Sequence, residues 1–142
     1  AEGIAVVEFI AGRERPPINR ENIPNCVYSQ PQVASTGLSE AKALDLGIEI
    51  KIGRFPFEAS GKAQASRNTD GFVKLIFGAR YGELLGGSII GHGATELIAE
   101  VTLAISMEAT YEELMWTIHA HPTLSEMVME AAGDAFDEAI NI

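Results

Sequence analysis

Residues 71–90 read GFVKLIFGARYGELLGGSII, and this stretch decides the fold. Two apolar runs, 71–77 and 84–90, have the length and the composition of β-strands. The segment between them, GARYG at 78–82, begins and ends with glycine and is typical of a turn. The stretch therefore predicts a β-hairpin.

Further elements are expected on the N-terminal side of this hairpin. Val27 and Tyr28 form a short candidate strand. Ser39 is a suitable N-cap for a helix that ends near Leu46. Isoleucines alternate with other residues over 48–52, which is the period of a half-buried strand.

Three helices are expected on the C-terminal side, over about 94–107, 110–118 and 123–139. The last two begin with Thr-x-x-Glu, the capping-box pattern. The order of elements is strand, helix, three strands and three helices. Such segregation predicts an α+β fold, with an antiparallel sheet of about four to five strands covered by helices on one face.

Length and composition limit the class of protein. The chain has 142 residues, of which 46% are hydrophobic, enough to bury the core of one domain. It begins at Ala1, on residues that resemble the end of another unit, so we expect a piece of a longer protein. The single cysteine, Cys26, excludes an internal disulfide and a Cys-x-x-Cys pair, and we expect it to be a small buried side chain. No apolar run approaches the roughly 20 residues of a membrane span, so we expect a soluble intracellular protein.

The charge is distributed unevenly. The net charge is −10, all ten basic residues lie between Arg13 and Arg80, and residues 83–142 carry eleven acidic side chains and no lysine or arginine. A segment of this sign repels nucleic acid and anionic lipid and attracts a basic partner. The alternative is a solvated face that only keeps the protein in solution.

The octet HAHPTLSE at 119–126 is the strongest functional signal. Pro122 disfavours the helical conformation for His121, so the imidazole is held in a defined direction, five residues before Glu126. An imidazole with a carboxylate partner is suited to acid/base catalysis near neutral pH. Two other interpretations stay open: Glu126 caps a helix that begins at Thr123, or His119, His121 and Glu126 bind a metal ion.

Several motifs together resemble one known family, the C-terminal dimerisation (interface) domain of the flavin-dependent pyridine nucleotide-disulfide oxidoreductases, and among these the dihydrolipoyl dehydrogenases. The octet is the most specific of these motifs, and the additional His119 favours the dihydrolipoyl dehydrogenase branch. The resemblance covers nearly the whole chain and is carried by residues 23–28, 31–37, 55–57, 62–63, 69–74, 85–87 and 119–126.

The resemblance implies roles for individual residues. His121 would be the acid/base that exchanges a proton with a dihydrolipoamide thiol, and Glu126 would orient its ring. Pro122 would be a cis-proline, with Thr123 and His119 in supporting positions and no metal ion. In a homodimer, His121 would act in the partner subunit's active site, where the backbone at His121 and Pro122 would lie near the flavin.

The resemblance also implies domains, cofactors, partners and a location. Residues 1–22 would be the end of the preceding FAD domain with a linker, and 23–142 the dimerisation domain. The chain has no Gly-x-Gly-x-x-Gly motif and no Cys-x₄-Cys pair, so FAD and NAD would belong to the parent enzyme and this segment alone would be inactive and would bind neither. The expected partners are a second copy and a basic subunit-binding domain of a 2-oxo acid dehydrogenase complex. The expected location is the cytoplasm, or the mitochondrial matrix in a eukaryote.

Overall fold

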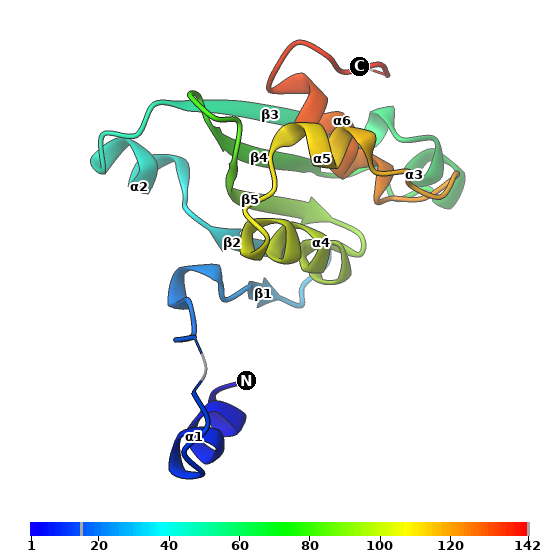
Figure 1. Ribbon diagram of the computed structural model, residues 1–142. Helices are drawn as coiled ribbons and strands as arrows, with labels where there is room; N and C mark the ends of the chain where they lie inside the picture. The colour runs from blue at the N-terminus through cyan, green and yellow to red at the C-terminus, as the bar shows by residue number, and fades with distance from the viewer. Residues whose placement is uncertain (15, 142) are drawn as a thin grey trace.

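The computed structural model describes residues 1–14 and 16–141. Its centre is a five-stranded antiparallel sheet in the order β1-β2-β5-β4-β3 (Figure 1). The α+β class is confirmed, and so is the predicted hairpin, which β4 and β5 form. The strands are β1 (Asn25–Val27), β2 (Gln32–Gly37), β3 (Ile50–Pro56), β4 (Phe72–Gly78) and β5 (Leu84–Gly91).

Strand β2 is absent from the sequence prediction. It lies inside the sheet, between β1 and β5, where Ala34 is the partner of Ile89. Its buried side chains, Ala34 and Thr36, are small, so the segment shows no strong apolar alternation. Pairing on both sides, rather than intrinsic preference, makes it a strand.

Strand β1 carries Cys26 at the edge of the sheet. The cysteine is free and packs against the apolar core, but it is only partly buried and not buried as expected. A strand at the edge has a neighbour on one side only, which leaves part of the side chain open to solvent.

Three helices follow the sheet and cover one of its faces (Figure 1). They are α4 (Ala94–Ser106), α5 (Tyr111–Trp116) and α6 (Glu126–Asp134). Helix α4 packs on β2 and β5, and α6 packs on β3, β4 and α5. The last helix is shorter at both ends than the predicted range 123–139. No helix of the described residues is long and apolar enough to span a bilayer.

The core lies between the sheet and these helices. In β4, the alternate residues Val73, Leu75 and Phe77 are buried in the same apolar cluster as residues of α4 and α6. Lys74 points to the other face, because successive side chains of a strand alternate. Its Nζ lies 3.4 Å from the carboxylate of Glu40 in helix α2 (Glu40–Asp45), so the second face also has a helix beside it. The expectation that helices lie on one face only is therefore incomplete.

The remaining elements are short. They are α1 (Glu2–Ile10), α2 (Glu40–Asp45), α3 (Gly61–Ser66) and the 3₁₀ turns η1 (Arg20–Asn22) and η2 (Phe57–Ala59). Helix α1 buries none of its residues and lies away from the sheet (Figure 1). The expected linker follows it and includes Arg15, which lies outside the described residues. That residues 1–22 end a preceding domain stays a prediction.

Two contacts fix α6 on the sheet. A Cβ atom at Gly53 in β3 would lie 1.8 Å from the carbonyl oxygen of Ala131, so only glycine allows the helix to come this close. Near the C-terminal end of α6, Oδ2 of Asp134 accepts a hydrogen bond of 2.7 Å from the backbone N–H of Arg54. These two contacts hold α6 against β3. They thereby also position Glu126, which lies in the first turn of the helix.

Candidate active site

The candidate site lies in the loop between α5 and α6. Helix α5 begins with the predicted capping box, in which Glu113 accepts hydrogen bonds from the backbone N–H of Thr110 at 2.7 Å and from its hydroxyl at 2.6 Å. The helix ends at Trp116, and the chain then runs through both histidines to α6. The peptide bond between His121 and Pro122 is cis.

His121 and Glu126 form a direct pair. Nδ1 of His121 lies 2.8 Å from Oε1 of Glu126, and the imidazole is 80% exposed. A ring N–H donates to a carboxylate at this distance, which fixes the proton of the neutral ring on Nδ1. The lone pair on Nε2 is then directed away from Glu126 and can accept a proton from a group outside this chain.

Glu126 also acts at the start of α6. Its second oxygen, Oε2, accepts a hydrogen bond of 2.8 Å from the backbone N–H of Thr123. The reciprocal half of the capping box is missing, because the Thr123 hydroxyl donates to the carbonyl of Ala120 at 2.6 Å and the N-cap residue is Ser125. One carboxylate therefore contacts both the imidazole of His121 and the backbone of Thr123.

The charge of Glu126 follows from its surroundings. Partial burial raises the pKa of its carboxyl group, but the hydrogen bond from Thr123 and the hydrogen bond and charge of His121 outweigh this, so the pKa is lowered from 4.5. Glu126 is therefore ionised at neutral pH. An ionised partner stabilises the imidazolium that His121 becomes when it takes a proton.

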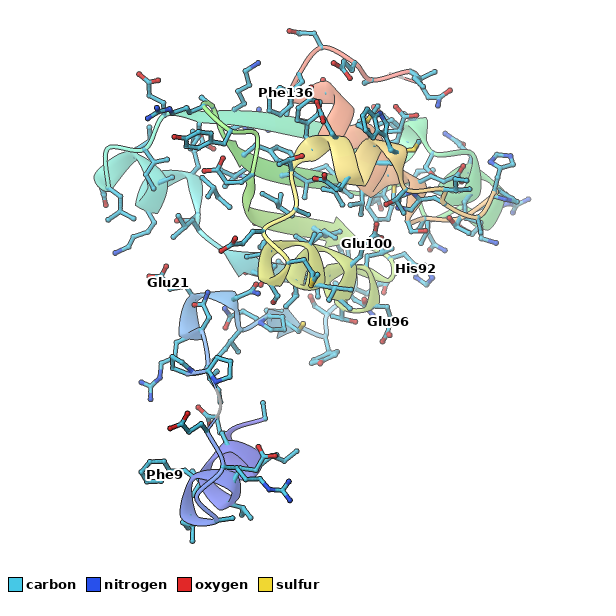
Figure 2. All side chains as sticks on the ribbon, viewed as in Figure 1. Phe9, Glu21, His92, Glu96, Glu100 and Phe136 are labelled. Atoms are coloured by element: carbon cyan, nitrogen blue, oxygen red, sulfur yellow. The ribbon has the colours of Figure 1, made fainter. Side chains whose placement is uncertain are left out.

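His119 points elsewhere. Its side chain is only 6% exposed, with Nε2 lying 2.6 Å from Oε1 of Glu100 in α4 and Nδ1 lying 2.9 Å from the carbonyl oxygen of Thr117. Figure 2 shows Glu100 on α4. The two histidines are thus held by different carboxylates, and His119 ties the loop to α4.

The structure does not assemble the alternative metal site. Within residues 1–14 and 16–141, no three His, Cys, Asp or Glu side chains are grouped so that they could hold a metal ion. Both ring nitrogens of His119 already lie at hydrogen-bond distance from other groups, so His119 is not available beside His121.

A cavity of about 300 Å³ opens beside the histidine–glutamate pair. Both polar and apolar residues line it, and they include residues that sequence reasoning missed. Glu130 and Asn141 are the most notable of these, because nothing in their local sequence indicates a site. The cavity is lined by Phe55, Ala59, Ser60, Gly61, Lys62, His121, Glu126, Met127, Glu130 and Asn141.

Known proteins have sequences similar to this one. Residues 23–132 match the pyridine nucleotide-disulphide oxidoreductase dimerisation domain. The chain is 52% identical to a dihydrolipoyl dehydrogenase of Chlorobaculum tepidum over 135 residues, which are 95% of this chain and 29% of that protein. It is 48% identical to a dihydrolipoyl dehydrogenase of Rhizobium etli over 141 residues, which are 99% of this chain and 29% of that protein. The chain thus spans less than a third of these relatives.

Solved structures share the fold. LpdA from Mycobacterium tuberculosis superposes with a TM-score of 0.87 and 25% identity, over 92% of this chain and 28% of that one. RclA, an HOCl-induced flavoprotein disulfide reductase from Escherichia coli, superposes with a TM-score of 0.83 and 25% identity, over 90% of this chain and 30% of that one. Since the family match covers most of the sequence, the chain belongs to the dimerisation-domain family of the pyridine nucleotide-disulphide oxidoreductases.

Proposed function

We propose that this chain is the dimerisation domain of a dihydrolipoyl dehydrogenase and that it supplies His121 and Glu126 as an acid/base pair to the active site of a second copy. The observation that carries the proposal is the 2.8 Å contact between Nδ1 of His121 and Oε1 of Glu126, on a ring that is 80% exposed. A buried histidine would serve packing, whereas an exposed and oriented ring is free to exchange protons with a substrate.

The chemistry follows from the proton on Nδ1. Nε2 of His121 takes the proton of one dihydrolipoamide thiol, and the resulting thiolate attacks a disulfide of the enzyme, so that a mixed disulfide forms and one cysteine thiolate leaves. The imidazolium then gives its proton to the released cysteine thiolate, and Nε2 takes the proton of the second substrate thiol. The second substrate thiolate attacks the substrate sulfur of the mixed disulfide, which closes the lipoamide disulfide and releases the second cysteine thiolate. Two electrons thus pass from the substrate to the cysteine pair, while Glu126 stabilises the positive ring.

The cofactors belong to other parts of the parent protein. The chain has neither a Gly-x-Gly-x-x-Gly motif nor a Cys-x₄-Cys pair, so the FAD, the NAD and the redox cysteines would be held outside it. FAD would carry the electron pair from the cysteines to NAD. This chain's own residues hold and move the proton.

Exposed apolar side chains on α4 and around the end of α5 support the proposal that a second copy binds. Leu103 and Met107 near the end of α4, Trp116 at the end of α5 and Ile118 just after it are all largely exposed, and Ile118 is 97% exposed. Apolar surface of this kind favours a self-complementary contact between two copies. The loop that carries His121 begins at this surface, so a contact there would bring the imidazole beside the other copy.

A mixed dimer of the full-length enzyme tests the trans arrangement. One subunit carries His121→Gln and the other lacks the redox cysteines. If the histidine acts in trans, the first subunit's cysteines meet the second subunit's intact His121, and one of the two sites works. If it acts within its own subunit, both sites are inactive, and a mixed dimer without dihydrolipoamide turnover would therefore refute the proposal.

A second candidate function is docking of a basic partner. A cavity of about 510 Å³ is lined by Glu21, Glu83 and Glu108, with Tyr81 at its side. Oε2 of Glu83 is buried without a hydrogen-bond partner among the described residues, as expected for a carboxylate that meets a cationic side chain when a partner binds. The affinity for a basic subunit-binding domain should then fall steeply with salt. An affinity independent of ionic strength would exclude this function.

A further inference from the structure

Glu130 is a buried carboxylate that the proposed mechanism does not use. It lies one turn after Glu126 on α6, is only 3% exposed, and forms no ion pair among the described residues. Burial of an ionised carboxylate is costly unless N–H groups surround it. Its environment therefore needs a specific explanation.

The C-terminal segment supplies the N–H groups. Oε2 of Glu130 accepts hydrogen bonds from the backbone N–H groups of Ile140, at 2.9 Å, and Asn141, at 3.2 Å. Oε1 accepts a third hydrogen bond from Nδ2 of Asn141. Ile140 and Asn141 are otherwise exposed, so these three bonds hold the segment against α6.

The same segment forms part of the cavity beside the acid/base pair. Asn141 and Glu130 line this cavity together with His121 and Glu126, while Met127 contributes apolar surface. If the three hydrogen bonds were lost, Asn141 would be free to leave and the cavity would lose part of its lining. The contact between His121 and Glu126 involves neither Glu130 nor Asn141, so it would persist.

We infer that Glu130 is a positioning residue, which fixes Asn141 as a wall of the cavity beside His121 and thereby sets how tightly the dithiol substrate binds. The inference rests on the proposed function. The inference predicts different effects on KM and kcat. Loss of Asn141 from the cavity wall weakens binding of dihydrolipoamide and raises KM, whereas proton transfer by His121 is retained, and kcat with it.

Moving the negative charge from residue 130 to residue 141 tests this inference in the full-length enzyme. Asn141→Asp places a second carboxylate against Oε1 of Glu130, and the two negative charges repel each other. Adding Glu130→Gln restores complementarity, because the new amide Nε2 donates to the carboxylate introduced at position 141 while the amide oxygen accepts from the two backbone N–H groups. The single variant should raise KM for dihydrolipoamide roughly tenfold, the loss expected when hydrogen bonds to a charged group are broken. E130Q/N141D should return KM to about the wild-type value.

Hydrogen exchange at residues 139–141 gives a readout that does not depend on catalysis. The amides of Ile140 and Asn141 should exchange faster in the Asn141→Asp enzyme and regain protection in the double variant. Asn25→Asp, the same change on the exposed edge strand β1, should leave both exchange and KM as they are. Asn141→Ala removes only one of the three bonds and should shift KM in the same direction by a smaller factor, which covers the case in which Asn141→Asp does not fold.

The outcomes separate this inference from the proposed function. Unchanged KM in both Asn141 variants, a fall of kcat at constant KM, or a double variant that does not recover would each overturn the role of Glu130. A His121→Gln enzyme with full turnover would overturn the proposed function instead, and the exchange measurement would still report on the tether.

Discussion

Nε2 of His119 lies 2.6 Å from Oε1 of Glu100, so a second histidine–carboxylate pair stands two residues away from the pair of His121 and Glu126. The two pairs have the same chemistry but different exposure, because the His119 side chain is 6% exposed and that of His121 is 80% exposed. The pair with the buried imidazole ties the loop to α4, whereas the imidazole of the other pair faces solvent. A variant of His119 can therefore serve as the control for a variant of His121.

His121→Gln in the full-length enzyme should lower the turnover of dihydrolipoamide by roughly 10²–10⁴-fold, the usual contribution of a positioned acid/base. His119→Gln should lower turnover far less and act mainly on the melting temperature, since it removes a tether and not a proton acceptor. Steady-state kinetics and thermal unfolding of both variants test this. Equal losses of turnover would contradict the assignment.

Glu126→Gln should lower turnover by about tenfold, because the amide has only one acceptor oxygen for His121 and Thr123 and carries no charge to stabilise the imidazolium. Glu113→Gln is the matched control, since Glu113 also accepts from the backbone N–H of a threonine three residues earlier. It should leave kcat unchanged. A loss of activity in the control variant as large as that at Glu126 would indicate that both glutamates only cap helices.

The lowered pKa of Glu126 predicts a pH-dependent contribution to stability. Its pKa in the folded protein lies below 4.5, the value for the unconstrained group, so its ionised form stabilises the fold above that pH. The contribution is lost as the pH falls through the folded-state pKa. Denaturant unfolding of the wild type and of Glu126→Gln should therefore show a stability difference that is constant near neutrality and shrinks in acid. A difference that persists unchanged in acid would contradict the assigned shift.

Gly53→Ala should destabilise the protein by about 1–3 kcal/mol or more, because the added Cβ overlaps the carbonyl oxygen of Ala131 and pushes α6 off β3. Gly61→Ala is the control, since no atom lies within 4 Å of a Cβ built there and the position opens α3. It should be neutral or slightly stabilising. Urea unfolding measures both variants, and similar stabilities would show that the close approach at Gly53 is not required.

Ile118→Asp should weaken self-association, since it places a charge on the apolar surface that follows α5. Sedimentation of the wild type at tens of micromolar should show a dimer, and the variant should shift toward monomer. Leu44→Asp introduces the same charge on an exposed leucine of α2, away from that surface, and should not change the association. A wild type that sediments only as a monomer would refute the prediction.

The sequence predicts those elements whose signal is local. The hairpin of β4 and β5 is evident from two long apolar runs, and Glu126 is identified as the partner of His121 because the two lie five residues apart. Strand β2 is not evident, because its small side chains are ordered by neighbours on both sides. In each case the outcome depends on whether the stabilising partner is near in the chain.

Glu130 shows the limit of such reasoning. An acidic residue on a terminal helix is expected to be solvated, and its burial depends on a chain reversal that brings Ile140 and Asn141 back onto α6. The range predicted for the final helix is too long for the same reason, since helix to about residue 139 would leave no room for this return. Residues 119–126 indicate an acid/base pair, but they do not indicate that Glu130 and Asn141 line the cavity beside it.

The hydrogen bond from the backbone N–H of Arg54 to Asp134 has a consequence for the outer border of the sheet. Strand β3 has a neighbour on one side only, and an unpaired strand border invites another chain to add to it, which is how fibres grow. Here a carboxylate occupies an outward N–H group that an incoming strand would need. The Asp134 carboxylate therefore removes one of the N–H groups that sheet extension at this border would use.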